Sequence, residues 1–483
     1  MKIENGSYIP QKALKGTGSS EVETGPDVRD LFDTQRVSLN YSKQIGKVDF
    51  TASGALVKAD NEFVFLDSTN RKRIRENASL VGGNVATGAH ITHSSGFLDV
   101  NGSALYHERN VPGRLGSETP DANQNDFQGR GNFRYRTEDF FTENLTFDIN
   151  THFDYYQIDY FDPKWSVNST HTTYAVGTDV SQEMLYFNFL TLVYGGSLNY
   201  EKMDSTDLGV RERVYTGGFI ENVIYLSPTF TLQPVIRYDY YSDFGSSLNY
   251  KLGTVYNLSP ELSLKGNVSR SFRAPTFNDL YWPRDAFAEG NPDLVPEIGY
   301  SADIGLSSVR QKIDYDLFAY LRYVENVIIW QPGEDSIWRP SNFGKGLYPG
   351  FEARARVSFL DYYTFSLDYS FLYSFVFSEG YTLLDNKRLP DIPVHSLNMG
   401  LNYSRNKASV HIGVQYQGLR YLKIENRAYM PSYFLVNGSY TRSLTNSISF
   451  LVSIDNVFGE AYENVNQYPM PGITVRTGIE MIL

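Results

Sequence analysis

Cysteine is absent from this chain of 483 residues, which excludes a disulfide framework and any thiolate metal site. Apolar runs are short, and none reaches the roughly 18 residues that a membrane-spanning helix needs. The N-terminal segment Met1–Pro10 lacks the apolar core of a secretory signal peptide. Positive charge is in deficit: 43 basic against 55 acidic residues give a net charge of −12, which argues against non-specific nucleic-acid binding.

Catalytic motifs are missing as well. The seven histidines form no His-Glu-x-x-His pair, and His90 and His93 are three residues apart in an alternating segment, so they point to opposite faces. The sequence contains no Gly-x-Ser-x-Gly elbow and no phosphate-binding loop. We therefore do not expect an enzyme.

Aromatic residues are abundant, with 37 Tyr and 31 Phe. No linker rich in Ser, Gly or Pro divides the chain, so residues 1–483 are expected to form one domain. A chain that is polar on average can still be a membrane protein if it forms a transmembrane β-barrel. The strands of a transmembrane barrel alternate between apolar residues that face lipid and polar residues that face the lumen.

Short polar turns alternate with long irregular segments along the whole chain. The predicted turns lie near 44–47, 94–96, 142–144, 190–191, 227–228, 259–260, 307–308, 361–362, 405–407 and 444–446. The predicted long connections are 11–34, 59–76, 108–126, 157–180, 203–212, 240–248, 274–297, 328–342, 374–388, 420–430 and 460–472. These ten turns and eleven loops join 22 strands. Regular alternation of this kind is typical of an outer-membrane barrel, which has short periplasmic turns and long outer loops.

The strands have the two faces that such a barrel requires. In the segment 313–323, Ile313 and Leu321 lie on one face, while Asp316 and Arg322 lie on the other. A dry core would not accept those charges unpaired. We therefore predict an all-β fold, a transmembrane antiparallel β-barrel of about 22 strands. A soluble β-sandwich is the alternative, and it is disfavoured because so many strands occur without a domain break.

One stretch, residues 271–297, is especially dense in turn formers and aromatics. Its prolines, among them Pro275 and Pro296, cannot donate to a strand ladder and so interrupt pairing on each side. Gly290-Asn291-Pro292 is strong turn chemistry. In the order of the predicted connections this stretch is the seventh outer loop, so we expect it at the mouth of the barrel.

Several motifs resemble the barrel signatures of TonB-dependent outer-membrane receptors. In the order of that family they are Arg273-Ala274-Pro275, Gly290-Asn291-Pro292-Asp293-Leu294, Pro296-Glu297, Asn342–Glu352 with Gly350, Arg388–Pro393, Pro431-Ser432-Tyr433, Ile454–Gly459 with Asn456, Tyr462, and Pro471-Gly472. The resemblance implies structural roles for these residues in a barrel that closes around a plug. The family's N-terminal plug and its energy-coupling box find no match in this chain. We therefore expect the plug to be missing here, and the plug and export signal to be encoded upstream of Met1.

Three ligand classes follow from the resemblance. Haem receptors typically place a haem-binding His between the Arg-Ala-Pro and Asn-Pro boxes, and residues 276–290 contain none, so haem is disfavoured. Cobalamin receptors are similar to this chain at Val111-Pro112-Gly113 and along 155–163. Receptors for ferric siderophores, which use aromatic and Arg-rich loops for anionic iron chelates, are the alternative.

Candidate binding residues lie in the predicted outer loops. The ligand contacts that we predict are Tyr160, Trp165, Tyr281, Trp282 and Arg284. In cobalamin receptors, acidic residues of the early loops bind calcium, which takes about six or more oxygen ligands. By that resemblance, the candidates for calcium as a cofactor are Asp60, Asp162 and Asp179. Solvated loop acids are the alternative interpretation of these three.

The resemblance implies the barrel of a receptor in the bacterial outer membrane that takes up a scarce metal chelate, with cobalamin favoured. The expected partners are outer-membrane lipid, a bulky metal-chelate ligand, and a periplasmic TonB-type energy coupler that acts through a plug. The class alternative is a passive pore of large diameter, which would follow from a missing plug.

Overall fold

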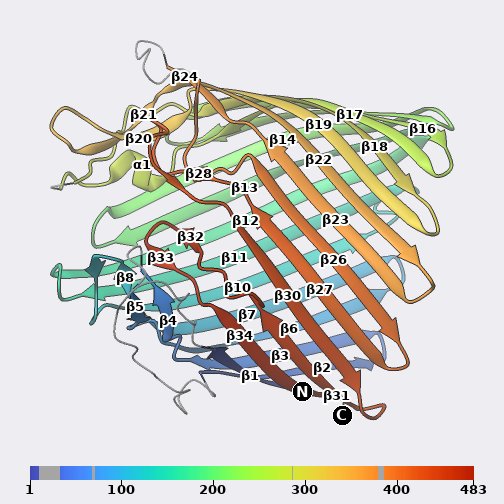
Figure 1. The fold of residues 1–483 in the computed structure, drawn as a ribbon. Coiled ribbons are helices and arrows are strands. Elements are labelled where there is room, and N and C mark those ends of the chain that lie inside the picture. Colours follow the sequence, from blue (N-terminus) through green and yellow to red (C-terminus); the bar gives the residue numbers. More distant parts are fainter. Residues whose placement is uncertain (10–32, 68–70, 286, 379–385, 483) are drawn as a thin grey trace.

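The protein is described by a computed structural model that covers residues 1–9, 33–67, 71–285, 287–378 and 386–482. Within these residues, 22 long antiparallel strands form one closed barrel, which confirms the predicted fold class (Figure 1). Their bounds are β1 (Lys2–Ile9), β2 (Thr34–Ile45), β3 (Val48–Ala59), β6 (Leu80–His93), β7 (Gly96–Asn110), β10 (Asn123–Thr137), β11 (Leu145–Asp162), β12 (Val167–Phe187), β13 (Leu190–Ser205), β14 (Gly209–Ser227), β15 (Phe230–Tyr241), β16 (Gly245–Ser259), β17 (Leu262–Arg273), β18 (Glu297–Val309), β19 (Ile313–Glu325), β22 (Gly344–Phe359), β23 (Tyr363–Leu372), β26 (His395–Arg405), β27 (Ala408–Gln417), β30 (Tyr433–Ser443), β31 (Ile448–Asp455) and β34 (Ile473–Met481).

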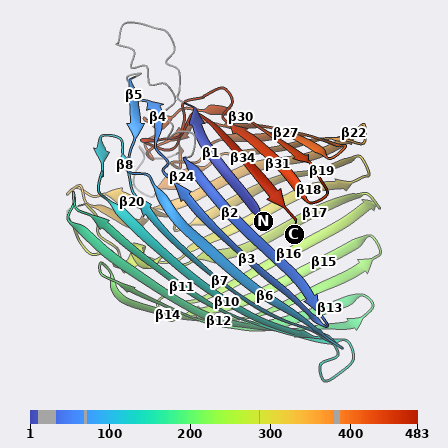
Figure 2. The same cartoon turned by 90° about the horizontal axis from the view of Figure 1, so that it is seen from below.

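The first and last strands close the barrel. β1 pairs with β2 on one side and with β34 on the other, so Lys2 lies opposite both Ser38 and Glu480. Figure 2 shows β1 between these two neighbours, with the two chain ends beside each other. Because each of the 22 strands has two neighbours, no strand edge is left open to lipid.

The connections follow the predicted alternation, with ten short turns at one end of the barrel and eleven other connections at the opposite end (Figure 1). Two turns are displaced by a few residues from the prediction: Leu190 and Thr191 begin β13, and Ser307 and Ser308 belong to the end of β18. Three of the predicted long connections, 157–180, 203–212 and 240–248, are wrong, because the strands continue and leave only 163–166, 206–208 and 242–244 between them. β11 and β12 pair without a break as far as Asp162 and Val167. Two hairpin strands can continue outside the membrane for as long as their backbone groups hydrogen-bond to each other.

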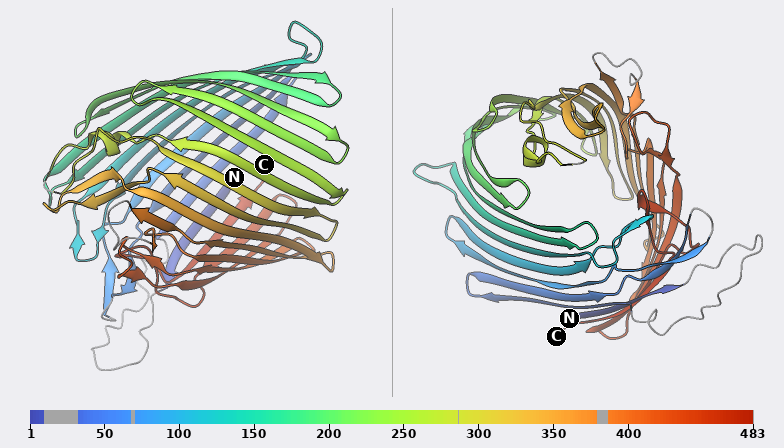
Figure 3. Two further views of the ribbon diagram at one scale, coloured as in Figure 1. Left: turned by 90° about the horizontal axis from the view of Figure 1, so that it is seen from above. Right: turned by 90° about the vertical axis from the view of Figure 1, so that its left-hand side faces the viewer.

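The two faces of the wall have different chemistry. On β19, Ile313 and Leu321 face outward and are 47% exposed each, while Asp316 and Arg322 face inward. The same alternation runs in register through the neighbouring strands, as expected for a wall between lipid and water. Figure 3, at right, looks along the barrel from its loop end and shows the closed ring of strands.

The remaining elements are short and belong to the outer connections. They are β4 (Phe63–Leu66), β5 (Lys72–Arg75), β8 (Gly113–Arg114), β9 (Ser117–Glu118), α1 (Phe277–Tyr281), β20 (Ile328–Pro332), β21 (Trp338–Asn342), β24 (Phe375–Ser378), β25 (Lys387–Arg388), β28 (Arg420–Tyr421), β29 (Tyr429–Met430), β32 (Glu463–Val465) and β33 (Tyr468–Pro469). In Figure 3, at right, α1 lies within the outline of the ring of strands.

Among the described residues, no helix has the length and apolar character needed to cross a membrane.

Glycine permits close contact between neighbouring strands at specific points of the wall. A Cβ atom at Gly195 on β13 would overlap the main-chain carbonyl oxygen of Val180 on β12, whereas a Cβ atom at Gly131 on β10 would meet nothing within 4 Å. The overlap at Gly195 can be relieved only by moving backbone, since the obstructing atom belongs to the paired strand.

We predict that Gly195→Ala lowers the stability of the folded barrel by roughly 1–3 kcal/mol, the usual cost of overpacking. The matched control Gly131→Ala should change it little. Both variants can be compared by the temperature at which the folded band is lost on semi-native electrophoresis. Equal shifts for the two glycines would contradict the proposed strand contact.

Candidate functional site: a braced mouth

The segment between β17 and β18 forms the most heavily braced part of the mouth. At its base, the Arg273 guanidinium donates two hydrogen bonds to the Glu297 carboxylate, at 2.8 and 2.7 Å, across the last pair of the ladder. The same carboxylate accepts a hydrogen bond from the backbone N–H of Ile328 at 2.8 Å. The two signature residues thus close the loop at its root and attach it to the next connection.

Local sequence explains why this loop contains α1. Thr276 caps the helix by accepting from the Asp279 N–H, and the Asp279 carboxylate accepts from the Thr276 N–H and hydroxyl in return. Asp279 is nearly buried and also accepts from the Trp330 indole at 2.8 Å. A single carboxylate therefore caps the helix and fixes it to the β20–β21 hairpin.

The turn after α1 is held by the second signature motif. A side chain at Gly290 would lie only 2.5 Å from the Trp282 backbone nitrogen, so a residue without a Cβ is required there. Asn291 donates from its backbone to the Asp279 carbonyl and from its side chain to the Pro340 carbonyl, at 2.8 and 3.1 Å. Pro292 and Pro296 follow outside the strand ladder.

Arg339 of β21 joins the hairpin to the loop a second time. Its guanidinium forms ion pairs with Glu289 at 2.8 Å and with Asp335 at 3.0 Å. Hydrogen bonds from Arg339 lower the pKa of the Asp335 carboxyl to about 2, so this carboxylate remains ionised at physiological pH. Because the pair is exposed, it contributes mainly to geometry.

The wall of the barrel supplies a buried anchor for the same loop. Arg213 on β14 is 7% exposed, pairs with Asp243 at 2.6 Å and donates to the Pro275 carbonyl at 3.0 Å. Its guanidinium also lies 4.8 Å from the centre of the Phe277 ring. Arg213 thus connects β14, the β15–β16 connection and the start of α1, and sequence reasoning did not single it out.

Three predicted contact residues are brought together here. The Tyr281 ring lies under the Arg211 guanidinium, 4.3 Å from its carbon to the ring centre. The Trp282 indole donates to Asp285 at 3.2 Å, and Arg284 is largely exposed, 3.8 Å from Asp335. Tyr281, Trp282 and Arg284 therefore lie close together in sequence on the braced loop, each with a different partner.

The other two predicted contacts lie on the tip of the β11–β12 hairpin. The Tyr160 hydroxyl donates to Asp162 at 3.2 Å, and Trp165 is 58% exposed beneath the Lys164 ammonium. Lys164 donates to the Glu118 carbonyl at 2.7 Å, which attaches this tip to β9. The structure thus divides the predicted contacts between two connections.

The early loops are tied together by side chains that reach from one loop to the next. The side-chain amide of Asn77 donates to three main-chain carbonyls, those of Val111, Thr119 and Ala122. The Arg75 side chain donates to the Gly113 carbonyl and stacks on the Tyr468 ring at 5.2 Å. Only a pattern of contacts across distant loops identifies such residues, and a single sequence carries no signal for it.

The three candidate calcium residues do not converge. Asp162 is 1% exposed and accepts from Tyr160 and from the Lys164 backbone, whereas Asp179 lies well within β12, opposite Asn150. Asp60 lies just after β3, where its backbone donates to the Asp33 carbonyl. Within the described ranges, no three His, Asp or Glu side chains are placed to hold a metal ion. These residues therefore do not fit a calcium site as they stand, and calcium stays a prediction from the resemblance.

Below the braced loop, the inner wall has a cavity of about 700 Å³. Its lining combines the Arg273–Glu297 pair and Arg322 with tyrosines and apolar side chains from β19, β22 and the β23–β26 connection. A mostly apolar cavity with a few polar groups is the usual form of a small-molecule site. Because Arg273 and Glu297, at the root of the braced loop, line it, we take this cavity as the inner part of the candidate site.

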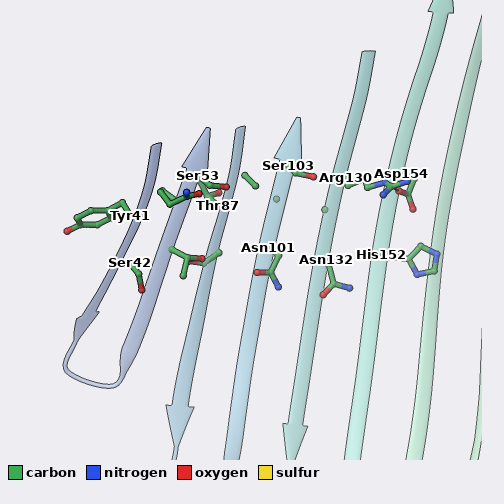
Figure 4. Close-up of a pocket in the computed structure, with 17 residues that line it drawn as sticks. Tyr41, Ser42, Ser53, Thr87, Asn101, Ser103, Arg130, Asn132, His152 and Asp154 are labelled. Carbon is green, nitrogen blue, oxygen red and sulfur yellow. Dashed lines mark hydrogen bonds and ion pairs between the residues drawn. The ribbon is translucent and has the colours of Figure 1, made fainter. Parts of the chain in front are cut away.

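A second concavity lies on the opposite part of the wall and has another character. Figure 4 shows its lining from β2 to β11, with the small side chains of Ser53 and Ser103 to the left of Asn132, His152 and the Arg130–Asp154 ion pair. Many of the side chains that line it, across six strands, are small and polar. Such a surface suits contact with water or with another polar protein surface more than capture of an apolar ligand.

Other signature residues are architectural in this structure. The side chain of Asn456, 3% exposed, accepts from the Glu460 N–H and donates to the Glu460 and Pro471 carbonyls, so it holds the β31–β34 connection next to buried Gly472. Gly350 on β22 leaves room for the ring of Tyr320 on the paired strand.

We predict that Arg213→Ala loosens the braced loop, because it leaves Asp243 without its partner in a nearly buried place. Trypsin cleavage after exposed Arg284 should then become at least about tenfold faster at unchanged barrel integrity. Arg354→Ala, which removes the exposed pair with Asp368 at 2.8 Å, is the matched control and should leave the cleavage rate unchanged. A loop that is equally resistant in both variants would show that Arg213 is not its anchor.

A family model described as TonB dependent receptor-like, beta-barrel, matches residues 22–457 of the chain. Among curated relatives, the vitamin B12 transporter BtuB of Photobacterium profundum is 26% identical over 279 residues, which are 56% of this chain and 44% of that protein. BtuB of Vibrio vulnificus strain YJ016 is 31% identical over 184 residues, 38% of this chain and 27% of that protein.

The iron-regulated outer membrane virulence protein of Vibrio cholerae strain N16961 is 24% identical over 338 residues, 61% of this chain and 51% of that protein. The chain thus spans about half or less of the curated relatives it matches.

Solved structures share the fold over nearly the whole chain. The siderophore receptor PirA from Acinetobacter baumannii has a TM-score of 0.79 at 13% identity, over 99% of this chain and 80% of that one. The ferric enterobactin receptor PfeA from Pseudomonas aeruginosa, solved as a mutant in complex with enterobactin, has a TM-score of 0.77 at 14% identity, with the same coverage. The extent of the family match, together with the closed barrel and the placement of the signature motifs, shows that this chain belongs to the β-barrel family of TonB-dependent receptors of the outer membrane.

Proposed function

We propose that this barrel belongs to a receptor that captures a bulky metal chelate at its mouth for uptake, and that the ligand is cobalamin. The observation that carries the proposal is the braced loop between β17 and β18. Three independent attachments, through Arg213, Asp279 and Arg339, hold it in one position over the inner wall. A loop held in this way is preorganised, which lowers the entropic cost of binding a large ligand.

The chemistry of the mouth suits a large ligand with both apolar and polar edges. Tyr281 and Trp282 offer flat apolar surfaces, and Arg284 offers a cation. The cavity of about 700 Å³ beneath them adds further tyrosines and apolar side chains. Aromatic and Arg side chains of this kind contribute most of the binding energy at protein interfaces and ligand sites.

The choice between ligand classes rests on the relatives. The relatives named as vitamin B12 transporters favour cobalamin. The solved siderophore receptors have the same fold at identities of 13–14%. This similarity supports the fold and gives no information about which ligand this chain binds. A ferric siderophore is the second candidate, supported by the cationic side chains of Arg211 and Arg284 at the mouth.

Binding alone cannot move a ligand against a gradient, so uptake needs energy from outside the barrel. We propose that it comes from a periplasmic TonB-type coupler acting through a plug in the lumen. The hydrophilic wall in Figure 4 supports this, because its small polar residues suit contact with a polar protein surface. The described residues themselves form the wall, its connections and α1.

The test is a calorimetric titration of the purified, folded chain with cobalamin and with a ferric catecholate siderophore, with and without calcium. We expect saturable binding of cobalamin and at least about tenfold weaker binding by Trp282→Ala, a loss of about 1.4 kcal/mol. Phe141→Ala, which removes an aromatic ring that is 87% exposed at the turn end, is the control and should bind as the parent does.

The possible outcomes separate the alternatives. Binding of the ferric siderophore alone would replace cobalamin by the second candidate. Absence of binding to either ligand, with steady ligand-independent conductance in a planar bilayer, would favour the passive pore. An unchanged affinity in Trp282→Ala would place the contact away from the braced loop.

A further inference from the structure

A group of cations lies at the turn end of the barrel, far from the mouth. Arg405 ends β26, Lys407 lies in the following turn, and Arg442 lies near the end of β30. All three side chains are exposed. Ala408 on β27 pairs with Arg405 on one side and with Arg442 on the other. The two arginines therefore lie on either side of one β27 residue. We call Arg405, Lys407 and Arg442 the rim cations.

The rim cations have neutral partners. Arg442 donates to the Asn406 carbonyl at 3.0 Å, and Lys407 donates to the side-chain oxygen of Asn446 at 2.8 Å. The Arg405 guanidinium lies over the Tyr362 ring at 4.4 Å. In the part of the chain that the structure describes, none of the three forms an ion pair with a carboxylate. No carboxylate among the described residues therefore neutralises their positive charge.

The surroundings place these charges at the boundary between lipid and water. Arg405 and Arg442 continue the outward-facing rows of β26 and β30, after Leu401 and Tyr440, which are 36% and 40% exposed. Tyr403 packs against Tyr363 with ring centres 5.0 Å apart, and Phe359 stacks on Tyr363 at 5.3 Å. Outward aromatic rings of this kind mark the membrane interface of a barrel.

The three turns around the rim cations are poor in acid. They comprise residues 360–362, 406–407 and 444–447, and Asp361 is their only carboxylate. With three cations against one acid, the local charge is positive, although the chain as a whole carries −12. This local excess runs against the overall composition of the protein.

We propose that the rim cations form a binding site for the phosphodiester headgroup of an anionic phospholipid in the periplasmic leaflet. Arg405 and Arg442 would approach the phosphate from the two strands on either side of β27, and Lys407 from the turn between β26 and β27. The tyrosines and Leu401 would contact the glycerol and the first part of the acyl chains. Charge complementarity at the interface favours this occupant, because each Lys or Arg near an anionic membrane surface strengthens attraction by about fivefold.

The test is native mass spectrometry of the full folded chain in a neutral detergent, titrated with phosphatidylglycerol and, separately, with phosphatidylcholine. We expect the parent protein to retain phosphatidylglycerol preferentially. The triple variant Arg405→Gln, Lys407→Gln and Arg442→Gln should bind it at least about tenfold more weakly. A variant with Arg405→Lys and Arg442→Lys, which keeps the charge, should keep most of the binding. Inorganic phosphate, added as a competitor, should not displace the lipid if the acyl chains contribute.

The matched control removes two cations from another turn, with Arg310→Gln and Lys312→Gln. Arg310 already pairs with Glu261 at 3.1 Å, so this variant should bind the lipid as the parent does. Folding of every variant is checked by semi-native electrophoresis. The proposal is overturned if the parent does not prefer phosphatidylglycerol, if the control loses as much binding as the triple variant, or if free phosphate displaces the lipid completely.

Discussion

Every backbone N–H and C=O group inside a membrane must find its partner within the protein, because lipid offers none. In this barrel, that requirement is met by pairing each long strand on both sides, and the pair between β1 and β34 completes the ring. The closure extends to Met1, whose backbone carbonyl accepts a hydrogen bond from the Met481 N–H at 2.7 Å. Most other properties of the wall follow from this one constraint.

A closed ladder fixes which way each side chain points, because a shift of one residue would exchange the two faces of a strand. The apolar residues of β19 therefore face lipid and its charges face the lumen, in register with the neighbouring strands. The connections beyond the membrane are free of this rule and can be irregular. They then need fixed contacts of their own, such as those made by Arg213 and Asp279 in the braced loop.

This difference between the wall and its connections explains how much of the structure could be predicted from the sequence alone. Alternation and turn chemistry are local, so the strand number and the order of the connections could be predicted. The lengths of three outer connections could not, because the polar ends of the strands were taken for loop, as with Gln157 and Asp159 on β11 and in the predicted loops 203–212 and 240–248. Arg273, Glu297 and Gly290 were found through short motifs. Arg213, Trp330 and Asn77 were missed because these hydrogen-bond partners lie 34 to 62 residues away, and nothing local marks such a contact. The three candidate calcium residues lie apart, and the sequence could not show this for a related reason. Spacing in the sequence does not tell how far along the barrel axis Asp179 lies.

The partners of the arginines separate two kinds of role. At the mouth, Arg213, Arg273 and Arg339 each pair with a carboxylate. The pairs of Arg213 and Arg339 link separate segments, and the pair of Arg273 closes the end of the β17–β18 ladder. Their charge is neutralised by these carboxylates, so the three arginines stabilise the loops and attract external anions only weakly. At the turn end, Arg405 and Arg442 meet an aromatic ring and a carbonyl oxygen, which orient the side chain and leave its charge available. An oriented cation with no internal counter-charge gains most from an external anion, and at a membrane interface the nearest external anions are lipid headgroups.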